Sequence, residues 1–129
     1  MGKSQYLIDT NAVIDFLNNK LPISGFNFLG GVIDEIPNLS IISKIEILGF
    51  NTLEEHYDVL NNFINDSYVY DLSNEIVDKT IDLRKKSRIK LPDAIVAATA
   101  IIYNYTLITR NISDFKNIKG LTLINLYDL

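Results

Sequence analysis

Residues 6–17 read YLIDTNAVIDFL and decide how this chain folds. The first three of them are apolar and predict a short buried strand, and Asp9 follows at once. Apolar residues then recur at helical spacing, so a helix is expected to begin near Asn11. A carboxylate is thus predicted at the end of a buried strand, on the sheet edge where ligands bind in open α/β folds. Capping of the helix by Asp9 or Asn11 explains this short stretch equally well.

Composition narrows the class of protein. The 129 residues suffice for one domain with a real core, and we expect a single domain over residues 1–129. Cysteine is absent, which excludes disulfides, thiolate metal sites and thiol nucleophiles. The net charge of −4 means that any positive surface for nucleic acid must be local. The sequence shows neither an apolar run as long as a membrane span nor a signal peptide, so we expect a cytoplasmic protein with no membrane partner.

Predicted strands alternate with predicted helices along the whole chain. The strand patterns fall at 6–8, 39–42, 68–72, 106–109 and 121–126. The helix patterns fall at 11–17, 43–50, 53–64, 73–86 and 91–103, with a short or broken helix at 23–34, where three glycines interrupt the pattern. This alternation predicts an α/β fold with a mostly parallel sheet and helices on both faces.

Four acidic residues follow predicted strands or lie in the first turn of a predicted helix. They are Asp9, Glu46, Asp93 and Asp114. Each has an ordinary structural explanation. Glu46 could complete a capping box with Ser43. The helix dipole favours Asp93 near a helix N-terminus, and Asp114 could be a turn residue.

Together the four carboxylates predict a cation site. The segments that follow parallel strands open on one edge of the sheet, so these side chains should converge there. Clustered carboxylates raise one another's pKa unless a cation neutralises them. Mg²⁺ and Mn²⁺ prefer such oxygen ligands, and the chain has no Cys and only one His, His56, to offer instead. Such a site suits phosphoryl chemistry, and Asn11, Thr109 and Asn111 would add neutral hydrogen-bonding groups.

Three segments carry a resemblance to a known family. They are LIDTNAVIDFL (7–17), SKIEILGF (43–50) and LPDAIVAATAIIYNYTLITRNISDFKNIKGLTLIN (91–125). In these segments, and over nearly its whole length, the chain resembles PIN domains, specifically the VapC toxins of bacterial and archaeal toxin–antitoxin pairs. The resemblance implies a PIN-like three-layer fold, with a four- or five-stranded parallel sheet between helices. It also implies an Mg²⁺- or Mn²⁺-dependent endoribonuclease that cuts tRNA, rRNA or mRNA.

The resemblance also assigns roles to residues. It makes Asp9, Glu46 and Asp93 catalytic carboxylates and metal ligands. The family's fourth acidic position falls at Asn111 or at Asp114, and we rank Asp114 after the first three catalytic residues. The polar supporting residues correspond to Thr10, Asn11, Thr109 and Asn111. The implied reaction is attack by metal-activated water on a phosphodiester, which leaves a 5′-phosphate and a 3′-hydroxyl.

Protein partners are implied in the same way. Such toxins are usually homodimers. A cognate antitoxin of the VapB type inserts a C-terminal segment, often bearing an Arg, into the acidic pocket. Residues 23–34 and 53–64 would supply surfaces for that partner.

Basic residues crowd the segment before Asp93. They are Arg84, Lys85, Lys86, Arg88 and Lys90. One interpretation is that these five residues, Arg84, Lys86 and Arg88 above all, hold an RNA backbone beside the metal site. Arg110, Lys116 and Lys119 would extend the path. The alternative is that cations favour the last turn of a helix. The aromatic residues on apolar faces are predicted to be core rather than base-stacking groups; they are Tyr57, Phe63, Tyr68 and Tyr103.

Two other functions fit parts of the pattern. A receiver-like signalling domain, which accepts a phosphoryl group on an Asp, also alternates strands and helices. It usually has an acidic pair after its first strand, where Thr10 and Asn11 follow Asp9 here, and a Lys after its last strand, where this chain has none. The second alternative is a PIN scaffold that no longer cuts RNA and only binds partners; the unsettled fourth acidic position favours it.

Overall fold

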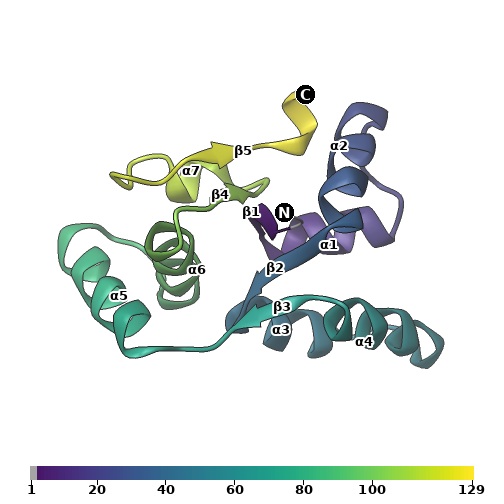
Figure 1. Ribbon diagram of the computed structural model, residues 1–129, viewed down its shortest axis with the longest axis horizontal. Helices are drawn as coiled ribbons and strands as arrows, with labels where there is room; N and C mark the ends of the chain where they lie inside the picture. Colours follow the sequence, from purple (N-terminus) through teal and green to yellow (C-terminus); the bar gives the residue numbers. More distant parts are fainter. Residues whose placement is uncertain (1–2) are drawn as a thin grey trace.

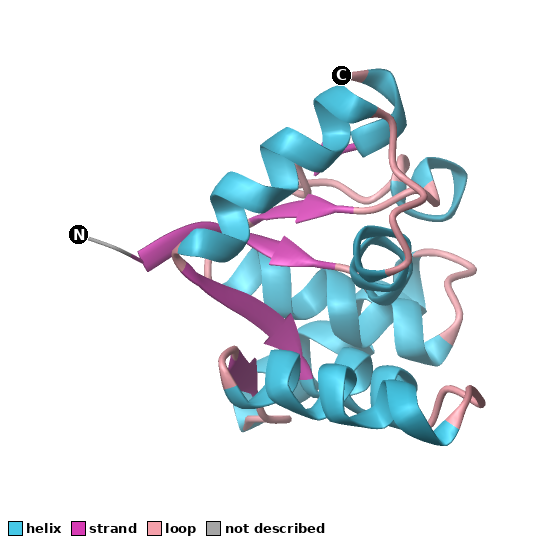
Figure 2. Cartoon of the chain, turned by 90° about the vertical axis from the view of Figure 1, so that its right-hand side faces the viewer, coloured by secondary structure: helices cyan, strands magenta, loops and turns pink. Residues whose placement is uncertain are grey.

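A parallel sheet forms the centre of the computed structural model, which describes residues 3–129 (Figure 1). The strands are β1 (Lys3–Ile8), β2 (Ile36–Ser40), β3 (Tyr68–Tyr70), β4 (Thr106–Ile108) and β5 (Leu123–Ile124). The helices are α1 (Thr10–Leu17), α2 (Ile23–Asp34), α3 (Ile41–Leu48), α4 (Tyr57–Asn65), α5 (Asn74–Lys86), α6 (Leu91–Ile102) and α7 (Ile112–Phe115). Two 3₁₀ turns are η1 (Glu54–His56) and η2 (Leu126–Asp128). The predicted α/β fold is confirmed, because the strands all run in one direction (Figure 2) and helices cover both faces of the sheet.

The strand order places a crevice beside β1. The order is β3-β2-β1-β4-β5, so the chain moves outward from β1 to β3 and then returns to the other side of β1. The order reverses between β1 and β4, which pair in parallel with Leu7 opposite Leu107. In open α/β sheets such a reversal opens a ligand-binding crevice at the carboxyl ends of the strands. The residues that directly follow these two ends are Asp9 and Thr109.

Alternate residues of the two central strands build a separate core on each face. Leu7 and Leu107 belong to the core under α5, α6 and α7. Ile8 and Ile108 belong to the core under α1, α2, α4 and η2. All four are fully buried, as the two-residue period of a strand requires. Helix α6 is buried on nearly every side, which explains its apolar sequence, yet no helix within residues 3–129 is long and apolar enough to cross a membrane.

Helix α3 begins earlier than its sequence pattern predicts. The pattern predicts a strand over 39–42 and a helix from Ser43, but β2 ends at Ser40 and the helix follows at once. The Ser40 hydroxyl caps the helix by accepting a hydrogen bond from the Ile42 amide at 3.1 Å. The predicted capping box of Ser43 and Glu46 is therefore wrong. Glu46 lies beyond the first turn, and the buried Ser43 hydroxyl has no hydrogen-bond partner within residues 3–129.

Three further predictions of local structure need correction. Residues 23–34 form one unbroken helix rather than a short or broken one. Residues 53–64 divide between η1 and α4 instead of forming a single helix. Tyr68 and Tyr103 were predicted to be core but are 52% and 39% exposed. They pack on the buried ring of Tyr70, because β3 is an edge strand with no neighbour to cover its outer side.

Gly25 and Gly31 lie in the same helix but should respond oppositely to alanine. A Cβ at Gly25 would lie 2.3 Å from the backbone oxygen of Leu126, because α2 packs closely on η2. A Cβ at Gly31 would meet nothing within 4 Å. We expect Gly25→Ala to lower the free energy of unfolding by about 1–3 kcal/mol, and Gly31→Ala to raise it by about 0.5–1 kcal/mol. Urea unfolding measures both effects, and equal responses would contradict the close packing of α2 on η2.

Candidate active site

A hollow of about 650 Å³ brings together side chains from four separate segments. All four predicted carboxylates line it, namely Asp9, Glu46, Asp93 and Asp114. The polar residues in the same lining are Thr10, Asn11, Lys90 and Asn111. Thr109 lies behind them, because its hydroxyl binds Asp9. The convergence expected from the sheet topology is therefore present in the structure.

Asp9 is the buried carboxylate of this hollow. The residue is 7% exposed. Its Oδ1 accepts a hydrogen bond from the Thr10 amide at 2.9 Å, and its Oδ2 accepts one from the Thr109 hydroxyl at 2.8 Å. The Thr109 oxygen in turn accepts a hydrogen bond from the Asn111 amide at 3.0 Å. Asp9 also occupies the N-cap of α1, so the capping and site interpretations describe the same side chain.

Glu46 reaches the hollow from α3. The residue is exposed, and its Oε1 accepts a hydrogen bond from the Thr10 hydroxyl at 2.6 Å. The amide of the same threonine binds Asp9. Thr10 therefore links the carboxylate that follows β1 to the carboxylate on the helix that follows β2.

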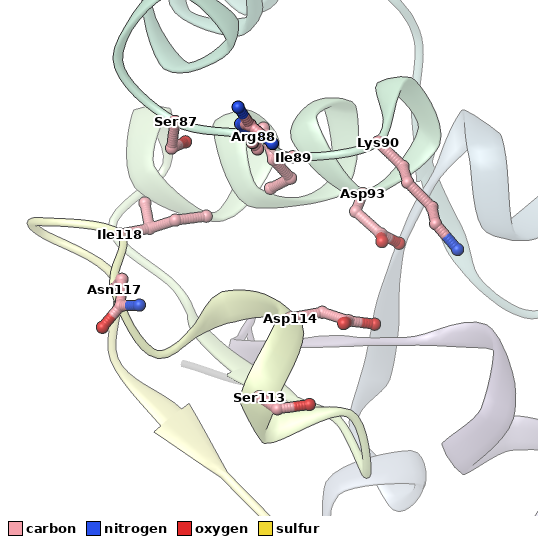
Figure 3. A pocket seen from close by; sticks show the side chains of 9 residues that line it. All are labelled: Ser87, Arg88, Ile89, Lys90, Asp93, Ser113, Asp114, Asn117 and Ile118. Atoms are coloured by element: carbon pink, nitrogen blue, oxygen red, sulfur yellow. The ribbon is translucent and has the colours of Figure 1, made fainter.

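Asp93 and Asp114 come from the N-terminal turns of α6 and α7. Figure 3 shows both carboxylates directed toward the same side, with the Lys90 side chain extending next to Asp93. Lys90 is the N-cap residue of α6 and lines the hollow. The sequence pattern placed it among the basic residues that could contact RNA, three residues before Asp93, but did not predict that it lines the acidic hollow itself.

The pKa of Asp9 lies above its ordinary value of 3.8. Burial is the largest cause, and the charges of Asp93 and Glu46 raise the pKa further. The hydrogen bonds from Thr109 and Thr10 oppose this shift because they stabilise the charged form. Two neutral donors, the Thr10 amide and the Thr109 hydroxyl, therefore hold this carboxyl in place.

The pKa of Asp93 is raised as well. Burial is again the largest cause, and the charges of Asp114 and Glu46 add repulsion, while Lys90 acts in the opposite direction. The pKa shifts of Asp9 and Asp93 thus share a cause, the repulsion among carboxylates that line one hollow.

The donor set of the hollow suits a hard divalent cation. Within residues 3–129, no three acidic or histidine side chains are arranged to hold one metal ion together. Mg²⁺ does not require three, because it usually keeps several waters and takes one or two carboxylates from the protein. Asp9 together with Asp93 or with Glu46 would supply that number of carboxylates, since all three line the same hollow.

The cations predicted to contact RNA differ in their surroundings. Arg84 donates a hydrogen bond to the carbonyl oxygen of Ile89 at 3.0 Å. Lys86 forms an exposed ion pair with Asp82 at 3.1 Å. Arg88 makes no hydrogen bond or ion pair with any residue of the described range 3–129, and it lines a second hollow next to the first.

Arg110 belongs to a network that the sequence pattern did not reveal. Its Nη1 lies 3.0 Å from Oδ2 of Asp15, a residue that is 6% exposed. The same oxygen accepts a hydrogen bond from the Tyr127 hydroxyl at 2.9 Å. Because Arg110 directly follows Thr109, the network fixes the segment whose hydroxyl holds Asp9. No local motif marks it, since its members lie on α1, on the loop after β4 and on η2.

Comparison with known proteins finds one family and one curated relative. The family model of the PIN domain matches residues 6–121. A ribonuclease VapC from Rickettsia bellii (strain RML369-C) is 41% identical over 63 residues, which are 47% of this chain. The matched stretch spans only 42% of the length of that protein.

Solved structures with the same fold match nearly the whole chain. A toxin–antitoxin complex from Klebsiella pneumoniae contains a chain with 26% identity and a TM-score of 0.76, covering 96% of this chain and 99% of that one. VapBC2 from Rickettsia felis, bound to a DNA fragment from its promoter, also gives 26% identity and a TM-score of 0.76, covering 93% and 97% of the two chains. DNA-bound VapBC from Salmonella typhimurium has a TM-score of 0.80 at 20% identity, covers 96% and 99%, and supports the fold alone.

Replacing Thr109 by Val should raise the pKa of Asp9 further. Valine keeps the branched shape of the side chain but lacks the hydroxyl that donates to Oδ2 of Asp9. Titration of the Asp9 carboxyl, followed by ¹³C NMR, measures the shift. Thr109→Ser retains the hydroxyl and is the matched control, with a pKa expected close to that of the parent. The same pKa in the Val variant and the parent would refute the role of this hydrogen bond.

Without divalent cations, Asp9 should make the protein less stable as the pH rises above 3.8. Its pKa is higher in the folded state than in the unfolded state, so between the two values the folded state binds more protons. The free energy of unfolding therefore falls with pH over this window, and the loss is complete above the raised pKa. The pKa of Asp93 is also raised, so this residue adds to the fall in the free energy of unfolding with pH.

Urea unfolding in EDTA at a series of pH values tests this dependence. The difference between the parent and Asp9→Asn isolates the contribution of Asp9 from those of other carboxylates. We expect Asp9→Asn to flatten the decline and Asp71→Asn, at an exposed loop position, to leave it unchanged. Identical slopes for the parent and Asp9→Asn would show that Asp9 carries no such shift.

Proposed function

Because this chain belongs to the PIN domain family, whose model matches residues 6–121, we propose that it is a divalent-cation-dependent endoribonuclease of the VapC toxin type. The observation that carries the proposal is the hollow at the reversal of strand order, where four carboxylates meet. Identity of 41% with part of a ribonuclease VapC supports it. We propose that the protein acts on RNA in the cytoplasm.

The proposed ligands of Mg²⁺ or Mn²⁺ are drawn from Asp9, Asp93 and Glu46, with Asp9 paired with one of the other two at a time, because no three acidic side chains within residues 3–129 are placed to hold one ion together. Asp114 is proposed as a further catalytic carboxylate. When bound, a divalent cation lowers the pKa of water and stabilises negative charge on a phosphate. Asp9 is the best-oriented of these ligands, because donors from two segments hold its two oxygens. Each of those oxygens retains a second lone pair for a cation.

The proposed reaction is hydrolysis of a phosphodiester. The oxygen of water forms a bond to phosphorus, the bond between phosphorus and the 3′ oxygen breaks, and the 3′ oxygen takes up a proton. The products are a 5′-phosphate and a 3′-hydroxyl. Asn11 and Asn111 line the same hollow and would offer neutral donors to phosphate oxygens, where additional carboxylates would repel them.

The proposed substrate is RNA, whether tRNA, rRNA or mRNA. Of the cations predicted to contact it, Arg84, Lys86 and Arg110 already bind groups of the protein itself. Arg88 has no hydrogen-bond or ion-pair partner within residues 3–129, and Lys90 lines the acidic hollow. We therefore propose Arg88 and Lys90 as the principal phosphate contacts, with the other three shaping the loops or adding weaker attraction at the rim.

We also propose a cognate antitoxin as a protein partner. The chains that share 26% identity with this one come from toxin–antitoxin complexes. Apolar side chains at the edge of the acidic hollow favour a protein contact there, because Ile45 and Phe50 line it and are 61% and 41% exposed. The exposed Tyr68 and Tyr103 lie on another part of the surface and would suit a homodimer contact.

The structure excludes one of the two alternative functions, and the other remains a competing proposal. A receiver-like domain is rejected, because that fold has the strand order 2-1-3-4-5, whereas this sheet has the order β3-β2-β1-β4-β5. A PIN scaffold without nuclease activity is the competing proposal. It is favoured by the lack, within residues 3–129, of three acidic side chains placed to hold one ion.

Cleavage of total RNA by the purified protein should require Mg²⁺ or Mn²⁺ and should stop with EDTA. Asp9→Asn and Asp93→Asn should each lower the rate by more than about a hundredfold, since mutating groups that merely orient metal ligands already costs 10–100-fold. Gel analysis of end-labelled RNA measures the rate, and Asp71→Asn is the control for loss of one negative charge. Equal cleavage by the parent and by both variants would count decisively against the assignment. Absence of cleavage by the parent would favour the scaffold.

A further inference from the structure

A second hollow adjoins the acidic one and is built differently. It has a volume of about 270 Å³ and shares Lys90, Asp93 and Asp114 with the acidic hollow. Figure 3 looks into it, with the loop between α5 and α6 on one side and α7 on the other. Any chain that lies across Asp93 and Asp114 can therefore continue into this space.

Arg88 gives this hollow an available positive charge. It is exposed and forms no hydrogen bond or ion pair with another residue in the described part of the chain. A guanidinium left without a protein partner, next to a site proposed to hold phosphate, is suited to bind an anion by two parallel hydrogen bonds. Nothing in the fold would be lost if it did so.

The loop that carries Arg88 is rigidly held. Arg84 donates to the carbonyl oxygen of Ile89 on one side of it. The amide and the hydroxyl of Ser87, on the other side, both donate to the carbonyl oxygen of Leu83 at 3.0 Å. A group presented by a fixed loop loses little conformational entropy on binding, which favours a specific site over a diffuse charge.

The opposite wall is also fixed, and its chemistry is mixed. Helix α7 is anchored by Phe115, which is 1% exposed. Ile118 on this wall and Ile89 on the loop of Arg88 provide largely buried apolar surface, each 8% exposed. Ser113 and Asn117 add polar groups that have no other hydrogen-bond partner within residues 3–129. The apolar surface suits the face of a nucleotide base, the amide suits the edge of the base, and the cation suits the phosphate.

We propose that this second hollow binds one nucleotide of the RNA, next to the phosphate that is cut. Arg88 pairs with the phosphate of that nucleotide, its base lies against Ile89 and Ile118, and the Asn117 amide bonds to the edge of the base. The hollow would then set the sequence preference of the enzyme. This inference rests on the proposed nuclease function and adds a specificity site to it.

A third hollow adjoins the second and would hold the part of the RNA that extends beyond that nucleotide. It has a volume of about 300 Å³ and shares Ser87, Asn117 and Ile118 with the second one. Its lining contains three lysines, Lys79, Lys86 and Lys119, and one carboxylate, Asp82, which forms ion pairs with Lys79 and Lys86. The acidic hollow, the nucleotide hollow and this lysine-lined hollow thus form a continuous path, which becomes more favourable to phosphate with distance from the carboxylates.

Binding of nucleoside monophosphates to the full chain tests the site without any cleavage. AMP, GMP, CMP and UMP are titrated in EDTA and followed by NMR of the backbone amides. We expect shifts confined to residues 87–90 and 113–118, and different affinities for the four bases. Arg88→Ala should weaken binding about tenfold, as expected for the loss of one charge-assisted contact. Arg88→Lys should be intermediate.

Matched controls separate the site from general attraction. Lys85→Ala removes a neighbouring positive charge that lines none of the three hollows, and it should leave the affinity unchanged. Asn117→Ala should reduce the differences among the four nucleotides. Inorganic phosphate should bind more weakly than any nucleotide. Phosphate that binds as tightly as the nucleotides, or equal losses in Arg88→Ala and Lys85→Ala, would overturn the proposal.

RNA cleavage then distinguishes failure of the site from failure of the proposed function. With an active parent, Arg88→Ala should raise KM and Asn117→Ala should broaden the set of cut sites mapped by end sequencing. Unchanged KM and cut sites in an active enzyme would reject the nucleotide site and leave the nuclease intact. A parent that binds nucleotides at this hollow but does not cleave RNA would reject the nuclease and leave the binding site.

Discussion

The structure depends on one buried carboxylate held by two neutral donors. Asp9 ends the central strand β1, and its amide extends the sheet by donating to the carbonyl oxygen of Ile108 at 2.9 Å. Its side chain lies between the Thr10 amide and the Thr109 hydroxyl, which come from the two sides of the strand-order reversal. Burying a negative charge is unfavourable, and these donors offset only part of the cost. A bound cation would remove the remainder, so the burial that destabilises the isolated protein would also favour the proposed metal binding.

Local sequence patterns predicted the two-layered core but not every boundary. The apolar runs ending at Ile8 and Ile108 are buried strands because the alternate side chains of each serve opposite cores. The predicted start of α3, at Ser43, was wrong because serine is a good N-cap residue and the sequence offers two, Ser40 and Ser43. The choice between them depends on the pairing of Ser40 with Tyr70 in the neighbouring strand, and a local pattern contains no information about that partner.

The candidate site was predictable to the extent that sheet topology determines it. Residues that follow parallel strands must share one edge, and Asp9, Glu46 and Asp114 do line one hollow there. Asp93 joins them from the first turn of α6, which follows α5 rather than a strand. The contacts that orient them were not predictable. Thr10 binds a carboxylate on another helix, and the Arg110–Asp15 pair joins positions that no sequence period relates. Such contacts depend on how helices pack across the sheet, which sequence spacing alone does not encode.

The basic residues near the acidic hollow divide into those that stabilise the protein's own loops and those that are available to a ligand. An acidic protein that binds a polyanion cannot rely on net charge, so the position of each cation matters more than the number of cations. Arg84 and Arg110 stabilise the loops on either side of the acidic hollow, where a phosphate contact would compete with their protein partners. Arg88 has no such competing partner within residues 3–129 and stands on a loop that Arg84 makes rigid. One arginine thus stabilises the loop that presents the other. In a chain of net charge −4, this arrangement would let a single basic cluster stabilise the fold and also bind the proposed anionic ligand.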